Sequence, residues 1–347
     1  MRDDRLADPE AVLEAAGESR MTVVIGDVDV GKTTLVTALA NGLLARGFRV
    51  GIVDADVGQS EIGPPTTIGL GRVVRSLERP RDAELVALRF VGATSAARDV
   101  LAAVVGTASL AERAHAFGLE RIVVDTSGLV RGDLGRRLKQ AKIDRLGPDI
   151  VVALQREGEC EPILRRYDHA TRPRVFRMDA LAGTRQRTPD ERRRHRERAL
   201  AAHFAGSRRV TLDPGCVTFR SPALFAGAAL PESALREAER VIETELVWGE
   251  WRIDELVLIS RTPLVAFARE GLVQHFRARA IVSHALEEFE DVLAGLDDTS
   301  LETLGLGVVR LLDFGAPALT LDTCVSAERI ASVTIGRERY SHPRFAV

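Results

Sequence analysis

Gly26-Asp-Val-Asp-Val-Gly31-Lys32-Thr33, followed by Thr34, has the G-x-x-x-x-G-K-[ST] spacing of a phosphate-binding loop. A short apolar run precedes it, and leucines recur every four residues in the segment after it, as on one face of a helix. A glycine-rich turn between a strand and a helix points backbone N–H groups at bound phosphates. The sequence therefore predicts a nucleoside-triphosphate site, in which Lys32 contacts the β- and γ-phosphates and Thr33 is a ligand for Mg²⁺. The residues predicted to hold the triphosphate are Gly26, Asp29, Val30, Gly31, Lys32, Thr33 and Thr34.

Short apolar runs alternate with helical stretches on both sides of this loop. The predicted strands are Thr22–Ile25, Val50–Val53, Leu85–Val91, Arg121–Val124 and Asp149–Leu154. The predicted helices between them include Lys32–Leu44 and Ala97–Phe117. Because strands that alternate with helices form a mostly parallel sheet flanked by helices, the predicted fold class is α/β.

The chain has 347 residues, which is enough for two domains of ordinary size. Residues 1–20 are a predicted lead-in, residues 21–208 form the predicted phosphate-binding domain, and residues 209–347 form a smaller mixed or β-rich domain. Within the smaller domain the predicted strands are Glu255–Ile259, Gly307–Leu312 and Ile330–Ile335. Its predicted helices are Glu232–Leu246 and His284–Leu293.

The overall charge is close to neutral, since 48 basic residues and 50 acidic residues give a formal net charge of −2. This balance excludes a protein that coats nucleic acid through bulk positive charge, so any polynucleotide contact requires a local patch. Only three of the 48 basic residues are lysines. Lys32 lies in the phosphate-binding loop, whereas Lys139 and Lys142 lie on a predicted helix and are a minor candidate for polynucleotide contact.

The cysteines and the hydropathy pattern bear on the cellular compartment. Three widely separated cysteines do not make a disulfide scaffold or a zinc site, and they fit a reducing cytoplasm. No apolar run approaches the roughly 18 residues of a membrane span, and the polar first residues lack the core of a signal peptide. The sequence therefore predicts a cytoplasmic protein with no membrane partner, and it gives no indication of oligomeric state.

Two acidic residues follow the second predicted strand, in Val53-Asp54-Ala-Asp56-Val-Gly-Gln59. Their spacing carries both carboxylates beyond the end of the strand. One carboxylate would hold Mg²⁺, directly or through water, and the other would take a proton from an attacking hydroxyl. The alternation by itself does not assign the two roles, and a solvated turn is the alternative interpretation.

An arginine-rich segment lies near the end of the first predicted domain. Residues 185–198 contain seven arginines and three acidic residues, a local net charge of +4. The stretch Thr188-Pro-Asp-Glu191 predicts a helix start, with threonine as the N-cap, proline at the first helical position and glutamate completing a capping box.

Four residues of this predicted helix, Arg192, Arg196, Leu200 and Phe204, recur at four-residue spacing and so share one stripe. If Leu200 and Phe204 dock on the core, the two arginines face the same way, over the triphosphate. A guanidinium group suits that position because its planar fork binds phosphate oxygens in pairs and keeps its charge. A solvated charged helix is the alternative interpretation.

Five segments between residues 21 and 206 match the motifs of a known family. Besides the phosphate-binding loop they are Asp54-x-Asp56-Val-Gly-Gln59 with Gly63-Pro-Pro-Thr-Thr-Ile-Gly69, Phe90-Val-Gly-Ala-Thr94-Ser95, Asp125-Thr126-Ser-Gly128-Leu129-Val130, and Arg187, Asp190, Arg192, Arg193 and Arg196 followed by Phe204 and Gly206. Together they resemble the polynucleotide 5′-hydroxyl kinases, the family of the eukaryotic pre-mRNA cleavage-complex and ribosomal-RNA-processing kinases and their archaeal relatives. In that family the fourth segment is a clasp that grips the substrate strand, and the fifth is a lid, here residues 185–206.

The resemblance implies a P-loop NTPase fold and transfer of the γ-phosphate of ATP, with Mg²⁺, to the 5′-hydroxyl end of RNA or DNA, in RNA processing or nucleic-acid repair. The catalytic residues would be Lys32, Asp56, Arg192 and Arg196, and the metal-binding residues Thr33 and Asp54. Arg187 and Arg193 would join the ATP site, and the substrate-binding residues would be Gln59, Thr94, Thr126 and Gly128. Leu129 departs from the family's clasp motif T-x-G-W, so the sequence leaves the choice of substrate open.

Three other functions share the phosphate-binding loop. A non-catalytic ATP-binding scaffold of an RNA-processing complex would keep the loop without turnover. A P-loop GTPase or metallochaperone-type switch usually carries an N-K-x-D-like motif after a late strand, and the corresponding stretch here, 152–157, reads V-A-L-Q-R-E. A small-molecule kinase would prefer free nucleosides to oligonucleotides.

Overall fold

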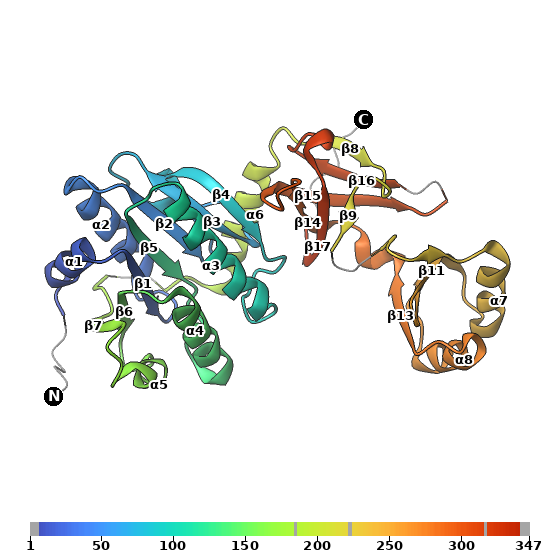
Figure 1. The fold of residues 1–347 in the computed structure, drawn as a ribbon, viewed down its shortest axis with the longest axis horizontal. Helices are drawn as coiled ribbons and strands as arrows, with labels where there is room; N and C mark the ends of the chain where they lie inside the picture. The colour runs from blue at the N-terminus through green and yellow to red at the C-terminus, as the bar shows by residue number, and fades with distance from the viewer. Residues whose placement is uncertain (1–6, 184–185, 221–223, 316–317, 341–347) are drawn as a thin grey trace. The chain divides into compact units, whose positions relative to one another are not determined.

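The computed structural model describes residues 7–183, 186–220, 224–315 and 318–340. The chain forms two compact units, Met1–His203 and Phe204–Val347 (Figure 1). The sequence places the boundary between its predicted domains a few residues later, after residue 208. Among the described residues, no helix combines the length and the apolar character that a membrane span needs.

The first unit is built on one sheet with the strand order β7-β6-β1-β5-β2-β3-β4. Its strands are β1 (Met21–Gly26), β2 (Val50–Ala55), β3 (Thr67–Val73), β4 (Glu84–Phe90), β5 (Arg121–Thr126), β6 (Ile150–Gln155) and β7 (Arg174–Asp179). The strand before the phosphate-binding loop, β1, lies between β5 and β6 and is parallel to both. The strands β3 and β4 are antiparallel to their neighbours, so the sheet is mostly parallel, as predicted.

Strand β3 is absent from the sequence-based prediction because two glycines weaken its apolar pattern. The structure explains one of them, Gly69, since a Cβ atom there would lie 2.0 Å from the carbonyl oxygen of Ile62. The segment after Asp56 therefore folds back against β3, and only glycine allows so close an approach.

Helices cover both faces of this sheet (Figure 1). They are α1 (Pro9–Glu18), α2 (Lys32–Ala45), α3 (Val100–Ala116), α4 (Gly132–Leu146), α5 (Glu161–Leu164) and α6 (Pro189–His203), with 3₁₀ turns η1 (Pro80–Asp82) and η2 (Arg165–Tyr167). Successive residues of β1 point to opposite faces: Val23 and Ile25 pack in one core with residues of α3 and α4, and Val24 packs in the other with residues of α1 and α2. This alternation buries both faces of the strand and fixes the position of the loop that follows it.

The second unit is β-rich and contains two sheets. One has the strand order β9-β17-β14-β15-β16-β8, and the other has the order β10-β11-β12-β13. The strands are β8 (Arg208–Leu212), β9 (Thr218–Phe219), β10 (Ala228–Ala229), β11 (Leu246–Arg252), β12 (Glu255–Ser260), β13 (Ala280–Ala285), β14 (Val292–Asp297), β15 (Thr303–Asp313), β16 (Ala318–Thr323) and β17 (Ser332–Arg339). The helices are α7 (Glu232–Ile242) and α8 (Ala266–Phe276), and the 3₁₀ turns are η3 (Leu286–Phe289) and η4 (Ala327–Arg329).

The predicted helix His284–Leu293 is wrong. The structure has the end of β13, the 3₁₀ turn η3 and the start of β14 in this segment. The carboxylate of Glu288 accepts a hydrogen bond from the amide of Ala285 at 2.8 Å, which caps the start of the 3₁₀ turn. Burial of β14 along its whole length then outweighs the helix propensity of the Ala-Leu-Glu-Glu run.

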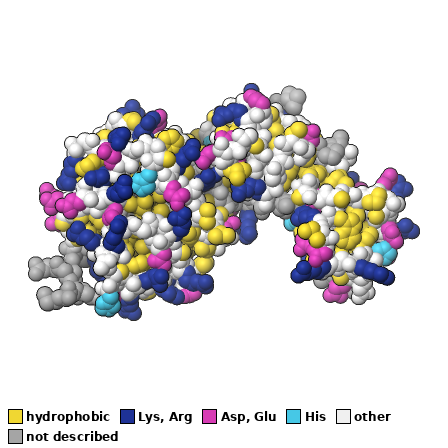
Figure 2. Space-filling view, viewed as in Figure 1, with side chains coloured by type: hydrophobic (Ala, Val, Ile, Leu, Met, Phe, Trp, Pro, Cys, Tyr) yellow, Lys and Arg dark blue, Asp and Glu magenta, His cyan; other side chains and the backbone are white. Residues whose placement is uncertain are grey.

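Charged side chains are distributed over the first unit in both signs. On the face drawn in Figure 2, Lys and Arg side chains alternate with Asp and Glu side chains and do not form one continuous basic surface. The mixed charge of this face agrees with the formal net charge of −2.

Candidate functional site

The phosphate-binding loop runs from the end of β1 into the first turn of α2. Its backbone depends on left-handed conformations at Asp29 (φ 54°) and at Gly31 (φ 95°), which is the N-cap of α2. Glycine has no side chain to cap α2, and within the described part of the chain no side-chain cap bond is formed there, which leaves the first N–H groups for a ligand. A helix N-terminus with free amides is a site for anions such as phosphate.

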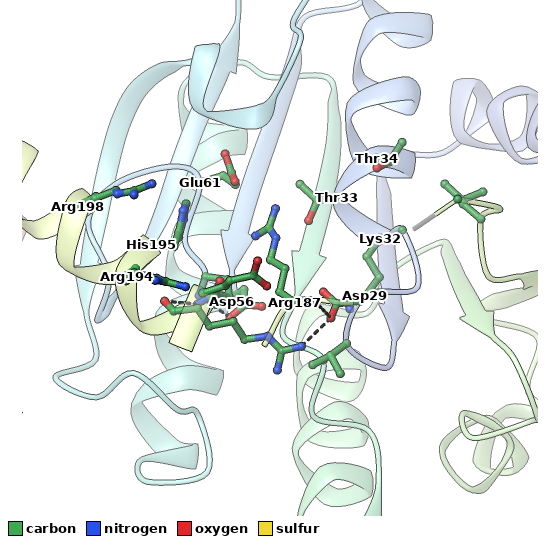
Figure 3. A pocket seen from close by; sticks show the side chains of 18 of the residues that line it. Asp29, Lys32, Thr33, Thr34, Asp56, Glu61, Arg187, Arg194, His195 and Arg198 are labelled. Carbon is green, nitrogen blue, oxygen red and sulfur yellow. Dashed lines mark hydrogen bonds and ion pairs between the residues drawn. The ribbon is translucent and has the colours of Figure 1, made fainter. Parts of the chain in front are cut away.

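A pocket of about 880 Å³ opens in front of this loop, within the first unit (Figure 3). Four parts of the chain line it: the phosphate-binding loop, the segment after β2, the segment after β5, and the segment that leads into and along α6. The lining residues are Val28, Asp29, Gly31, Lys32, Thr33, Thr34, Asp56, Gln59, Glu61, Gly128, Leu181, Ala182, Gly183, Arg187, Glu191, Arg192, Arg194, His195 and Arg198.

Lys32 and Thr33 are both held by hydrogen bonds at the floor of the pocket. Lys32 is 8% exposed, and its Nζ donates to the carbonyl oxygen of Asp27 in its own loop at 2.6 Å. The Thr33 hydroxyl donates to Oδ2 of Asp125 at 2.8 Å, and the other carboxylate oxygen of Asp125 is buried with no hydrogen-bond partner among the described residues. Burial raises the pKa of Asp125 to about 6, while Lys32 and the Thr33 hydroxyl act in the opposite direction.

Asp125 contacts the predicted site residue Thr33, but in the sequence-based prediction it appears only as the first residue of the clasp segment. It lies near the end of β5, directly beside β1 in the sheet. In the sequence, Asp125 could have been recognised as an acidic residue at the end of an apolar predicted strand. Only the strand order brings that acid to Thr33, 92 residues earlier in the chain.

The two acids after β2 occupy different environments. Asp56 lines the pocket, and its Oδ1 accepts hydrogen bonds from the amides of Gly58 and Gln59, each at 3.1 Å. Asp54 is buried, and its Oδ2 accepts hydrogen bonds from the amides of Glu61 at 2.6 Å and Ile62 at 2.9 Å. The Asp54 carboxylate therefore holds the backbone of the segment that follows Asp56, and Asp54 is not among the residues that line the pocket.

Burial and the neighbouring carboxylate of Asp125 raise the pKa of Asp54 to about 8, against the effect of the amides of Ile62 and Glu61. Asp54 and Asp125 are paired in the register of β2 and β5, so the two carboxylates are close along the same edge of the sheet. Of these two carboxylates, that of Asp125 contacts the Thr33 hydroxyl.

The lid helix begins as the sequence predicts. Helix α6 starts at Pro189, the amide of Glu191 donates to the Thr188 hydroxyl at 3.2 Å, and the amide of Thr188 donates to the Glu191 carboxylate at 2.8 Å. These two bonds are the reciprocal pair of a capping box. Residue 185, at the start of the predicted lid, lies outside the described residues.

The lid contacts the phosphate-binding loop through Asp29. Arg192 forms an ion pair with this carboxylate, with 2.7 Å between Nη2 and Oδ2, and the amide of Arg187 donates to the same oxygen at 2.9 Å. The side chain of Gln59 donates to the carbonyl oxygen of Arg192 at 3.4 Å, and its own Oε1 is buried without a partner among the described residues. The lid, the loop and the segment after β2 therefore meet around one cavity (Figure 3).

The face of α6 that borders the pocket differs from the predicted one. Glu191, Arg194, His195 and Arg198, which have the i, i+3, i+4, i+7 spacing of one helical face, line the cavity together with Arg192 at the border of that face. Leu200 is buried, but a residue eight positions after Arg192 is rotated by about 80° around the helix, so the two do not share a stripe.

The remaining lid residues divide between pocket and surface. Arg196 is not among the pocket-lining residues. Arg193 is exposed and lies 3.7 Å from Asp190 and 3.8 Å from Glu197, so its ion pairs are on the outer side of the helix. The structure brings Arg187 and Arg192 to the pocket from the predicted set, and leaves Arg193 and Arg196 outside it.

The clasp segment follows β5 and lies against the phosphate-binding loop. Gly128 lines the pocket, and a Cβ atom on it would lie 2.4 Å from Cγ1 and 2.7 Å from the backbone nitrogen of Val28. Thr126 is fully buried, and its hydroxyl donates to the carbonyl oxygen of Val24 at 2.8 Å, so the structure does not offer it to a substrate. Leu129 packs against the core beside α3 and α4. Thr94 is also outside the pocket lining, with its carbonyl oxygen against Gly58.

The two lysines of α4 are not a surface for polynucleotide, contrary to the sequence-based suggestion. Lys139 and Lys142 are 0% and 1% exposed, on the face of α4 that packs against the sheet. Their i, i+3 spacing places the two lysines on one side of α4. The apolar residues Leu138 and Ile143, which flank them in the sequence and are buried, indicate that this side faces inward.

These features define a P-loop nucleoside-triphosphate-binding protein. The glycine-rich loop lies at a helix N-terminus, a lysine and a threonine follow at its end, and an acid lies on the adjacent parallel strand. The family of the mRNA cleavage and polyadenylation factor CLP1 P-loop matches residues 26–206, just over half of the chain. The chain belongs to this CLP1 P-loop family, as the resemblance in its sequence implies.

Relatives match over nearly the whole chain. A polyribonucleotide 5′-hydroxyl-kinase of Pyrococcus abyssi is 30% identical over 342 residues, which cover 97% of this chain and 92% of that protein. A protein of the same name from Methanocaldococcus jannaschii is 30% identical over 311 residues, which cover 90% of this chain and 83% of that protein.

A solved structure shares the fold. The wild-type Clp1p–Pcf11p complex contains a chain that matches with a TM-score of 0.62 and 14% identity, covering 95% of this chain and 77% of that one. At this identity the likeness concerns the fold, and it extends through the second unit as well as the first.

Proposed function

We propose that the protein transfers the γ-phosphate of ATP to the 5′-hydroxyl end of a polynucleotide, with RNA as the preferred substrate. One observation carries the proposal: the carboxylate of Asp56 lines the same pocket as Lys32 of the phosphate-binding loop and Arg192 of the lid. A carboxylate facing a triphosphate site is the group that a kinase needs and a passive nucleotide scaffold does not. The names of the Pyrococcus and Methanocaldococcus relatives support the polyribonucleotide end as the acceptor.

The residues of the loop and the lid would bind the triphosphate. Lys32 would leave the carbonyl oxygen of Asp27 for the β- and γ-phosphates, and the free amides at the start of α2 would hold the phosphate oxygens. Arg192, together with Arg187, would balance the charge that moves with the transferred group.

The acceptor hydroxyl would lie beside Asp56. Both of the hydrogen bonds that orient this carboxylate use Oδ1, and Oδ2 accepts none from the described residues. Oδ2 is therefore the atom that would accept the proton of the 5′-hydroxyl as its oxygen attacks the γ-phosphorus. The product is a 5′-phosphorylated end, and ADP is the leaving group.

The residues around Thr33 fit a magnesium ion. Asp125 offers a buried carboxylate oxygen with no partner, beside a threonine hydroxyl, and oxygen ligands of this kind are those that Mg²⁺ prefers. When bound there, Mg²⁺ would neutralise charge on the β- and γ-phosphates. Thr33 and Asp125 would hold the ion directly or through water.

This assignment predicts different effects for two conservative variants. Asp125→Asn is expected to raise the Mg²⁺ concentration needed for half-maximal ATP binding by about 10- to 100-fold, because the neutral amide supports the ion less well. The measurement is the ATP dissociation constant across a Mg²⁺ titration. Asp54→Asn is the comparison. If it raises the required Mg²⁺ concentration more than Asp125→Asn does, then Asp54, the residue that the sequence favours, holds the metal.

The proposed function is tested by phosphate transfer. Purified protein with Mg²⁺ and ATP labelled at its γ-phosphate is incubated with 5′-hydroxyl RNA and DNA oligonucleotides of one sequence. We expect phosphatase-sensitive label on the RNA 5′ end, and none with Lys32→Ala, because the ammonium that grips the transferred phosphate is gone.

Other outcomes would identify a different function. ATP binding without transfer would contradict the kinase function and indicate a scaffold. Transfer to free nucleosides in preference to oligonucleotides would indicate a small-molecule kinase, and tighter binding of GTP than of ATP would indicate a GTPase-type switch.

A further inference from the structure

Two buried lysines lie behind the pocket, and the mechanism above does not use them. Lys139 and Lys142 are among the largest fully buried side chains of the protein, and both point inward from α4. The third lysine, Lys32, is the lysine of the phosphate-binding loop. In a chain that otherwise uses arginine 45 times, all three lysines therefore lie at this site or directly behind it.

Each of the two ammonium groups contacts backbone directly before a residue that lines the pocket. Nζ of Lys139 donates to the carbonyl oxygen of Ser127 at 2.5 Å and to its hydroxyl at 3.2 Å. Nζ of Lys142 donates to the carbonyl oxygen of Ala55 at 3.4 Å. Ser127 directly precedes Gly128, and Ala55 directly precedes Asp56, and both of these next residues line the pocket.

The two loops leave the sheet side by side. In the parallel pairing of β2 with β5, Ala55 lies opposite Thr126, the residue before Ser127. The hydrogen bonds of the sheet end at this point. The two ammonium groups of α4 contact the chain here, Lys142 at the last residue of β2 and Lys139 at the residue directly after β5, from positions three residues apart on one helix.

Stability alone is a poor explanation for these two charges. An ammonium group has three N–H donors, and those of Lys139 and Lys142 have two acceptors and one acceptor among the described residues. Burial lowers the pKa of Lys142 to about 8 and lowers that of Lys139 well below its usual range, while Asp56 opposes the shift in both. The hydrogen bonds of both amines go to backbone carbonyl and serine oxygens, and burying an ammonium group that is not paired with a carboxylate costs free energy, so the two lysines are better explained by the backbone that they hold.

We propose that Lys139 and Lys142 are positioning residues for phosphoryl transfer, which hold the loop that carries Asp56 and the loop that carries Gly128 at a fixed separation behind the pocket. This inference rests on the kinase function proposed above. Lysine suits the task because a compact ammonium on a flexible stem can reach a single carbonyl oxygen. The guanidinium of arginine is a wide planar fork with five donors, which one carbonyl does not satisfy.

Methionine substitutions test the proposal, because methionine keeps the unbranched stem and removes the charge. For Lys139→Met, Lys142→Met and the double variant, we expect kcat for 5′-hydroxyl RNA to fall by about 10²-fold, the effect of a displacement of roughly 1 Å at the reacting groups. The KM for ATP and the melting temperature should remain near the wild-type values, because Lys32 and the loop amides are untouched. Matched controls are Leu138→Met and Ile143→Met, buried neighbours on the same helix, which should keep the wild-type kcat.

The outcomes separate this inference from the proposed function. Folded methionine variants with wild-type kcat, beside a wild-type protein that transfers phosphate, would overturn the positioning role and leave the kinase function standing. A wild-type protein that transfers no phosphate would overturn both. If a methionine variant does not fold, Lys142→Arg provides the test, because it retains the charge. We expect this variant to have a reduced kcat with unchanged ATP affinity. A wild-type kcat would contradict the proposal.

Discussion

Replacing Arg192 with alanine is expected to lower kcat for RNA phosphorylation by about 10³-fold, with little change in the KM for ATP. The side chain of Arg192 contacts the phosphate-binding loop from the lid, through its ion pair with Asp29 at 2.7 Å. Lys32 and the amides of α2 would still bind the triphosphate in its absence. The loss therefore falls on the transition state, where charge moves onto the leaving and transferred oxygens.

Two further variants control this measurement. Arg192→Lys keeps the charge but not the planar fork, so we expect an intermediate kcat. Arg145→Ala removes an exposed arginine whose ion pair, with Glu112, is on the surface of the same unit, and it should have the wild-type kcat. A kcat for Arg192→Ala close to the wild-type value would mean that Arg192 only holds the lid against Asp29 and takes no part in transfer.

Replacing Asp56 with asparagine is expected to lower kcat by about 10²- to 10⁴-fold while ATP still binds. Asparagine has nearly the same shape, and its side-chain oxygen can accept the two hydrogen bonds from Gly58 and Gln59 that orient Asp56. The loop conformation is thus preserved, and the group that accepts the proton of the 5′-hydroxyl is removed. Single-turnover transfer with bound ATP measures this step directly.

The melting temperature and the ATP dissociation constant of Asp56→Asn complete the test. Values near those of the wild-type protein, together with the slow transfer, would assign the loss to the chemical step. Wild-type transfer by this variant would remove Asp56 from the reaction and leave proton transfer to water or to the phosphate itself.

Much of the first unit could be predicted from local sequence. The loop at 26–33 and the capping box of α6 are confirmed because each depends on a few adjacent residues and on backbone geometry that those residues favour. Strand β3 and the helix predicted at 284–293 show the limit of this approach. Close packing against Ile62 in one case, and full burial of β14 in the other, outweighed local propensity.

The sequence by itself determined the class of the protein, because the spacing of the phosphate-binding loop already specifies a strand, a turn and a helix with free amides. The tertiary structure alone decided which distant groups share the site. The Thr33 hydroxyl meets Asp125 across 92 residues, Arg192 meets Asp29 across 163 residues, and α4 turns its lysines inward. These contacts depend on strand order and on the rotation of each helix about its axis. Both are set by packing between segments far apart in the chain, which no local pattern encodes.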